Sequence, residues 1–296
     1  MSLLDREDLV GSLFFPQKDT RLTPRGAVDH RIAVRGGELH LRVHGTKGPL
    51  LLLFHGNGEI VSDWDPAAAS FLARGVRFAV VDYRGYGRSL GTPTMRRVLE
   101  DAWVALAYAH GLAGAPVIVM GRSLGSAPCW EVASAASVSA VIVDSGFTSV
   151  DAFARRRGVE PASLTRVERE ALDPLPKIAR VTVPTLLLHG ENDAVIAHTE
   201  AEHALAACNN RHAIDNEDDG GATRRGLRSR PQERASKRGS ASGEGGDWGE
   251  LLPPAAPKAR TAELATIPGR GHNDLSMHPA YWEALAPFLD ARSSAP

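Results

Sequence analysis

The stretch that decides the fold reads Val117-Ile118-Val119-Met120-Gly121-Arg122-Ser123-Leu124-Gly125. Its four leading apolar residues predict a buried strand, and the alanine-rich residues 123–136 predict a helix. The Gly-x-Ser-x-Gly pattern between them is typical of a nucleophile elbow, a sharp turn that exposes a serine hydroxyl and needs glycines for room. A serine in a glycine-rich turn is often structural, but the strand before it and the helix after it favour Ser123 as a nucleophile.

Short apolar runs alternate with longer helical patterns along most of the chain. The expected strands cover residues 31–34, 38–44, 50–54, 76–82, 116–120, 140–143, 185–188 and 262–267. The expected helices cover residues 62–74, 96–110, 123–136, 199–208 and 281–289, with helical character also around 153–157 and 163–172. This order predicts the α/β class, with a mostly parallel twisted sheet, helices on both of its faces and a small lid at most.

The stretch from residue 209 to about 261 differs in composition from the rest of the chain. It has few apolar residues, mixed charge and Asn-Asn, Gly-Gly, Ser-Gly and Pro-Pro steps, which predict disorder. We therefore expect an N-terminal extension over residues 1–30 and one domain over 31–296 that this insertion interrupts. A solvated loop, a charged interaction arm and translated non-coding sequence are all compatible with it.

A serine nucleophile needs a base, and the base needs a carboxylate that orients it. The expected strand 185–188 runs into His189-Gly190-Glu191-Asn192-Asp193. Active-site groups gather beyond the carboxyl ends of strands in open α/β sheets, so Asp193 is the predicted orienting acid. A helix-capping or turn role is the alternative for Asp193, and Asp144 after the strand 140–143 is the substitute position.

The base is expected beyond the acid, in the chain order Ser, Asp, His. Of the eleven histidines, five meet this condition: His198, His203, His212, His272 and His278. His272 lies in the loop 268–274 after the last expected strand, where it can turn back toward Ser123. We predict His272 as the general base.

A tetrahedral intermediate also needs two preorganised donors, and losing one typically lowers turnover by about 10²- to 10³-fold. The backbone N–H of Leu124 is one predicted donor. The N–H of Asn57, in the loop after the strand 50–54, is the other, beside glycines that permit close approach. A dinucleotide fingerprint starting at Gly56 is excluded, because its third glycine would fall at Val61.

The assembled motifs resemble those of the α/β-hydrolase superfamily over most of residues 31–208 and 262–290. They are Phe54-His55-Gly56-Asn57, Asp82-Tyr83-Arg84-Gly85-Tyr86-Gly87-Arg88-Ser89, Gly121-Arg122-Ser123-Leu124-Gly125-Ser126, His189-Gly190-x-x-Asp193 and Gly271-His272-Asn273-Asp274. Within the superfamily they look like the lid-poor Bem46-like and depalmitoylase-like branch. The resemblance implies the α/β-hydrolase fold and hydrolysis of carboxylic esters or thioesters, including release of fatty acyl groups from protein cysteines.

Composition limits the partners. Lys and Arg number 34 and Asp and Glu 35, a formal net charge of -1 that gives no broad attraction for nucleic acid or an anionic membrane. No apolar run approaches the roughly 20 residues of a membrane-spanning helix. The acidic start resembles no export signal, and with only Cys129 and Cys208 we expect a reducing, cytoplasmic location.

The predicted function is therefore that of a serine hydrolase acting on a small-molecule or acylated substrate, with no metal or organic cofactor. Without a membrane anchor or a cysteine-rich N-terminus, we do not expect depalmitoylation at a membrane. A peptidase or amidase with the same triad is one alternative. A non-catalytic ligand-binding version of the fold is another, and no pattern predicts an oligomeric state.

Overall fold

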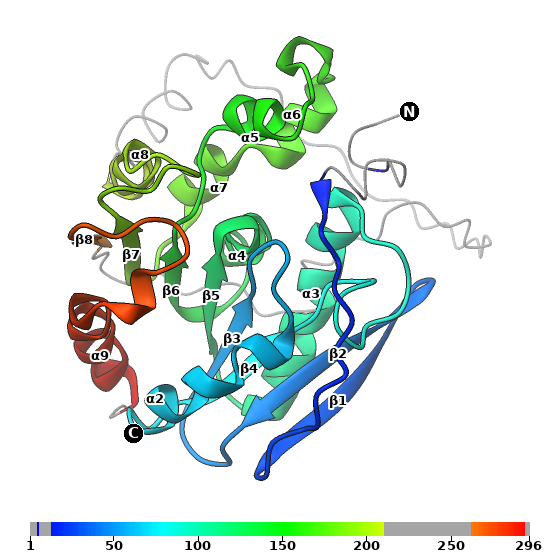
Figure 1. The fold of residues 1–296 in the computed structure, drawn as a ribbon, viewed down its shortest axis with the longest axis vertical. Helices are drawn as coiled ribbons and strands as arrows, with labels where there is room; N and C mark the ends of the chain where they lie inside the picture. The colour runs from blue at the N-terminus through cyan, green and yellow to red at the C-terminus, as the bar shows by residue number, and fades with distance from the viewer. Residues whose placement is uncertain (1–4, 6–12, 210–261, 294–296) are drawn as a thin grey trace, which may run out of the picture.

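The computed structural model describes Asp5 and residues 13–209 and 262–293, and the strands in these residues form a single sheet (Figure 1). The predicted insertion lies almost wholly outside the described residues. The strands are β1 Ala27–Val34, β2 Gly37–His44, β3 Leu50–Phe54, β4 Arg77–Val81, β5 Val117–Arg122, β6 Val138–Asp144, β7 Thr185–Gly190 and β8 Ala262–Ile267. Their spatial order is β1-β2-β4-β3-β5-β6-β7-β8. The pairs β1–β2 and β2–β4 are antiparallel, and every later pair is parallel.

The strand order places a switch point at the centre of the sheet. The chain moves outward from β3 to β4, then crosses back over β3 to β5 and continues to β8. In doubly wound sheets, ligands bind where the order reverses, at the carboxyl ends of the strands. Here the switch lies between β3 and β5, where Phe54 pairs with Gly121. The loops that follow Phe54 and Arg122 therefore start side by side.

Helices cover both faces of the sheet, as predicted. They are α2 Ala68–Leu72, α3 Met95–Ala113, α4 Ser126–Ala133, α5 Val150–Arg156, α6 Arg166–Leu172, α7 Pro174–Arg180, α8 Thr199–Asn209 and α9 Pro279–Ser293. Short 3₁₀ turns occupy Val61–Asp63, Asp65–Ala67, Ser123–Gly125, Pro161–Ser163 and Leu275–Met277. The α/β class with a mostly parallel sheet is confirmed.

Alternating side chains of the strands divide the core into two clusters. Along β3, Leu50, Leu52 and Phe54 join the cluster that includes residues of α3, α4, α7 and α8. Leu51 and Leu53 join the other cluster, which α2 and α9 complete. Helices α2 and α9 lie next to each other on that face, where Arg74 pairs with Asp290 at 3.3 Å (Figure 1). Both faces are thus buried, as a parallel sheet requires.

The helices differ most from the sequence prediction at three places. The helix expected over 62–74 is broken into two 3₁₀ turns and the short α2, because Pro66, the second residue of the second turn, lacks the N–H that a continuous helix needs. The helix expected from Ser123 begins as α4 only at Ser126. Helix α7 was not predicted, although Asp173 accepts a hydrogen bond from Leu175 N as its N-cap.

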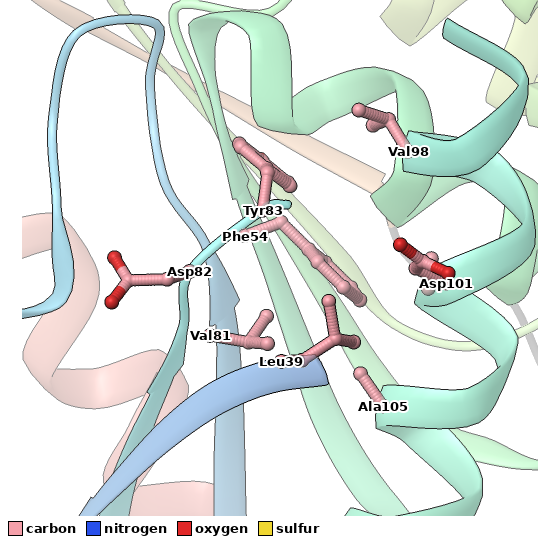
Figure 2. Close-up of a pocket in the computed structure, with 9 residues that line it drawn as sticks. Leu39, Phe54, Val81, Asp82, Tyr83, Val98, Asp101 and Ala105 are labelled. Atoms are coloured by element: carbon pink, nitrogen blue, oxygen red, sulfur yellow. The ribbon is translucent and has the colours of Figure 1, made fainter. Parts of the chain in front are cut away.

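A small void lies between β2, β3, β4 and α3 (Figure 2). Leu39, Phe54 and Tyr83 border it, and Asp101 faces it from α3. Its volume is about 10 Å³, which is room for one water molecule at most. Figure 2 shows the Asp82 carboxylate turned away from these side chains. This void is part of the core and is no substrate site.

Candidate active site

Ser123 lies directly after β5 in a strained turn. Its backbone has φ 50°, a left-handed conformation that is uncommon for a residue other than glycine. A Cβ added to Gly121 would overlap the carbonyl oxygen of Gly125, and one added to Gly125 would overlap that of Phe54. The two glycines are therefore needed for the turn to close against the end of β3.

His272 lies in the loop between β8 and α9, and its ring reaches Ser123. The distance from His272 Nε2 to Ser123 Oγ is 2.9 Å, and that from Nδ1 to Asp193 Oδ2 is 2.7 Å. An ionised carboxylate can only accept, so Nδ1 carries the proton and Nε2 is left as the acceptor for the hydroxyl. The ring is thus oriented to remove a proton from Ser123.

Asp193 is positioned by the turn that follows β7. Its Oδ1 accepts hydrogen bonds from the backbone N–H groups of Val195 and Ile196, both at 2.8 Å, and its Oδ2 also lies 3.4 Å from His189 Nε2. Burial alone would raise the pKa of this carboxyl, but the hydrogen bonds from His189 and His272 outweigh it and hold the pKa well below its usual value. Asp193 is therefore ionised at neutral pH.

The structure places the competing residues elsewhere. Asp144, the substitute acid, contacts Arg122, Ser145 and Tyr281. His198 Nε2 lies 2.8 Å from Thr266 Oγ1, and His278 Nδ1 accepts from the N–H of Ala280. His203 lies on α8, and His212 is outside the described residues.

The loop after β3 that carries Asn57 is tied down by its own side chain. Asn57 Nδ2 donates to the carbonyl of Leu13 at 2.8 Å, and Oδ1 accepts from Phe15 N and from Tyr86 Oη. Leu124, the other predicted donor, is buried in the turn after Ser123. No local pattern indicates that residues 13–15 contact this loop, because the contact joins segments over 40 residues apart in the chain.

Two charged residues that the sequence prediction missed also border the site. Arg122 precedes Ser123, and its Nε donates to Glu59 Oε1 at 2.6 Å. Glu59 lies two residues after Asn57. In the sequence they are only a cation next to the predicted nucleophile and an acid near Asn57, and neither position indicates that the two side chains pair.

The described residues contain neither a candidate metal cluster nor a candidate membrane-spanning helix. In residues 13–209 and 262–293, no three His, Cys, Asp or Glu side chains come together in a way that could hold a metal ion. Within the same part of the chain, no helix is both long and apolar enough to cross a bilayer.

Similar sequences point to one family. Residues 51–288 match the model of the Alpha/beta hydrolase family. The human Alpha/beta hydrolase domain-containing protein 17B is 32% identical over 163 residues, which are 53% of this chain and 53% of that protein. The mouse Alpha/beta hydrolase domain-containing protein 17C is 30% identical over 189 residues, 62% of this chain and 54% of that protein. The aligned region thus spans about half the length of these relatives.

Solved structures with similar folds are more distant in sequence. The esterase Pf2001 of Pyrococcus furiosus is 14% identical with a TM-score of 0.62, and the match covers 95% of this chain and 97% of that one. A predicted CIB-like hydrolase of Thermoplasma acidophilum is 17% identical with a TM-score of 0.51, covering 90% and 98%. At these identities the likeness shows the fold alone.

The fold, the family match and the relatives agree with the resemblance inferred from the motifs, including its depalmitoylase-like branch. The family match covers the elbow strand and the loops that carry Asn57, Asp193 and His272. The chain belongs to the Alpha/beta hydrolase family.

Proposed function

We propose that the chain is a serine hydrolase that cleaves carboxylic ester or thioester bonds through an acyl-enzyme intermediate on Ser123. The observation that carries this proposal is the continuous contact from Ser123 Oγ through His272 to Asp193, at 2.9 Å and 2.7 Å. A hydroxyl, an imidazole and an ionised carboxylate in this order are the groups that nucleophilic acyl transfer requires.

In the first step, Ser123 Oγ attacks the substrate carbonyl while His272 Nε2 takes the hydroxyl proton. The carbonyl oxygen becomes an oxyanion, which the N–H groups of Asn57 and Leu124 stabilise. Asp193 stabilises the imidazolium that forms on His272. The C–O or C–S bond then breaks as His272 returns the proton to the leaving alcohol or thiol.

In the second step, a water molecule replaces the leaving group. His272 removes a proton from this water, which attacks the acyl-enzyme, and the same two N–H groups stabilise the second oxyanion. Collapse releases the carboxylic acid and returns the proton to Ser123. Every proton passes through His272, so the proposed cycle uses no metal or organic cofactor.

We also propose a cytoplasmic location, because the chain has only two cysteines.

The deciding experiment is a panel of p-nitrophenyl esters and acyl thioesters of graded chain length, with an amide series beside it. We expect ester or thioester turnover by the wild type and a kcat about 10⁶-fold lower in Ser123→Ala. A fluorophosphonate probe should label Ser123 in the wild type and leave the variant unlabelled.

The matched control is Ser134→Ala at the end of α4, where the hydroxyl donates only to the carbonyl of Glu131. This variant should turn over substrate at the wild-type rate. Unchanged hydrolysis by Ser123→Ala would refute the proposal. Cleavage of amides with none of esters would replace it with a peptidase or amidase, and absence of both turnover and labelling would favour a non-catalytic fold.

A further inference from the structure

Arg122 is the residue immediately before Ser123, and its guanidinium lies where three segments meet. Nε donates to Glu59 Oε1 at 2.6 Å, and Nη1 donates to Asp144 Oδ1 at 3.2 Å. Nη2 donates to the carbonyl oxygen of His272 at 3.0 Å and to Asn273 Oδ1 at 3.4 Å. The side chain is only 10% exposed, so water does not screen these contacts strongly.

Glu59 transmits the contact with Arg122 to the oxyanion loop. Its second oxygen, Oε2, accepts from the backbone N–H of Gly56 at 2.8 Å and from Trp64 Nε1 at 3.0 Å. Gly56 directly precedes Asn57, the proposed oxyanion donor. Burial would raise the pKa of the Glu59 carboxyl, but the charge of Arg122 outweighs burial and lowers it, so Glu59 is ionised. The pair is therefore a charge-assisted link between Ser123's strand and the Asn57 loop.

On its other side, Arg122 holds the loop of the histidine. The ring of His272 is fixed by Asp193, and the start of its loop is joined to the turn after β7 by a hydrogen bond from Asn192 N to the Arg270 carbonyl at 2.8 Å. The backbone of His272 itself needs a further constraint. The Nη2 contact to the His272 carbonyl supplies one, and the hydrogen bond from Gly271 N to Asp274 Oδ1 at 2.8 Å supplies another. The guanidinium of Arg122 thus contacts both the His272 loop and Glu59, which holds the loop of Asn57. The backbone of Arg122 is joined directly to Ser123, the proposed nucleophile.

We propose that Arg122 is a positioning residue that fixes the distance between the His272 loop and the Gly56-Asn57 loop on either side of Ser123. This inference rests on the proposed function of Ser123 and His272. Its effect is on the geometry of the transition state, where a misplacement of about 1 Å can lower turnover by about 10²-fold.

A cavity beside Arg122 allows a chemical rescue of the variants that lack its side chain. It has a volume of about 510 Å³, and its lining includes Glu59, Trp64, Arg122, Asn273 and Trp282, with none of Ser123, Asp193 and His272. Removing the Arg122 side chain would therefore leave a space continuous with this cavity. A free guanidinium ion is small enough to enter it and reoccupy the position between Glu59, Asp144 and the His272 carbonyl.

The experiment measures kcat, KM and the fluorophosphonate labelling rate in Arg122→Ala, Arg122→Lys and Arg122→Gln. We expect Arg122→Ala to lower kcat and the labelling rate together by about 10²-fold, with KM changed by less than about threefold. Millimolar guanidinium chloride should restore at least about tenfold of the lost kcat, whereas sodium chloride of equal ionic strength should restore none. Arg122→Lys should lie between the wild type and Arg122→Ala, because an ammonium keeps the charge but loses the planar fork.

Arg84→Ala is the matched control. Arg84 is also a buried guanidinium, donating to both oxygens of Asp101 at 2.7 Å, yet within the described residues its hydrogen bonds reach only Asp101 and the Arg35 carbonyl. It should lose stability while keeping kcat, and guanidinium should not raise its activity. This control separates a general loss of folding from a loss of positioning.

Several results would overturn the proposal. They are a wild-type kcat in the Arg122 variants, a rise in KM alone, and a loss of kcat that guanidinium leaves unchanged. If Arg122→Ala does not fold, the kcat of Arg122→Lys and Arg122→Gln decides in the same way. Failure of the wild type to label at Ser123 would instead refute the proposed function, whereas normal labelling of wild type and variants alike would refute the positioning role alone.

Discussion

In the described residues, two histidines have Nδ1 within 2.8 Å of a buried carboxylate, and only one of the two has a hydroxyl at its other ring nitrogen. His272 Nδ1 is 2.7 Å from Asp193, and its Nε2 is 2.9 Å from Ser123 Oγ. His40, on β2, has nearly the same first contact, 2.8 Å from Nδ1 to Asp82 Oδ2. Its Nε2, however, lies 3.1 Å from a second carboxylate oxygen, Asp29 Oδ1.

The group at Nε2 distinguishes the proposed catalytic pair, His272 and Asp193, from the structural pair, His40 and Asp82. With a carboxylate on each side, the His40 ring is held between two acceptors and has no group from which to take a proton. The neighbouring Arg42, fully buried, contacts Asp29 and Asp65 and completes an ionic network at the antiparallel edge of the sheet. A histidine–carboxylate contact is therefore no sign of catalysis unless a nucleophile stands on the far side of the ring.

Replacing His272 should have the largest effect. His272→Ala removes the proposed base and should lower kcat by about 10⁶-fold, while the melting temperature stays within a few degrees of the wild type because the ring is at the edge of the core. Steady-state kinetics and thermal unfolding measure the two effects. His278→Ala, six residues later, is the control and should keep its activity. A decrease smaller than tenfold in His272→Ala would remove the contrast with His40.

Asp193→Asn should come next, with kcat lowered by about 10⁴-fold. The amide has the shape of the carboxylate, but it can present an N–H to Nδ1 and so favour the wrong tautomer of His272. KM should change little, because the Asp193 side chain is fully buried. Comparable turnover in wild type and Asp193→Asn, measured on the best ester of the panel, would show that the orienting acid lies elsewhere.

His40→Ala should lower the stability of the protein and leave its kcat largely unchanged, the opposite of His272→Ala. Asp82 and Asp29 would lose their shared partner, and breaking a buried pair typically costs about 3–5 kcal/mol of unfolding free energy. The kcat of the folded protein should stay within about tenfold of the wild type. Denaturant unfolding tests the first expectation. His30→Ala, which removes a half-buried contact to Tyr108 Oη at 3.1 Å, is the control and should lose about 1 kcal/mol. A hundredfold loss of kcat in folded His40→Ala would contradict the structural role.

Lowering the pH should destabilise the fold through the carboxylates next to His40 and His272. Burial raises the pKa of Asp29, Asp82 and Asp193, but hydrogen bonds from Arg42, His40 and His189 respectively outweigh it, so all three have pKa values below their usual range. The unfolded chain then binds more protons than the folded one, and the stability that these groups add is lost as pH falls below about 5. Urea midpoints between neutral pH and pH ~3 should decrease, and less steeply in Asp29→Asn. Midpoints independent of pH would refute this expectation.

The sequence was most informative where structure depends on near neighbours. The strand before Ser123 and the two glycines around it predict the elbow, because the turn is decided within a few residues. The positions of Asp193 and His272 follow from a topological rule, that loops after parallel strands meet at one edge. The structure brings His272 against both Ser123 and Asp193, and the catalytic role of the three residues stays a prediction.

Contacts between distant segments could not be predicted in the same way. Arg122 meets Glu59 and Asp144 across 63 and 22 residues, and nothing local marks a buried guanidinium before a serine. The same holds for residues 13–15 on Asn57. The break in the helix expected over 62–74 has a local cause, Pro66, which the sequence shows. The helical spacing of apolar residues outweighed this proline in the prediction.

The proposed triad also has a consequence for how the protein acquires activity as it folds. Ser123 and His272 are 149 residues apart, and Asp193 and His272 are 79 apart. No contiguous fragment shorter than this span contains all three, and β8 must dock on β7 before the His272 loop can reach the elbow. Such non-local parallel pairing is slow to form. In a refolding experiment, returning hydrolysis would therefore time the docking of the last strand, after most of the helical signal has recovered.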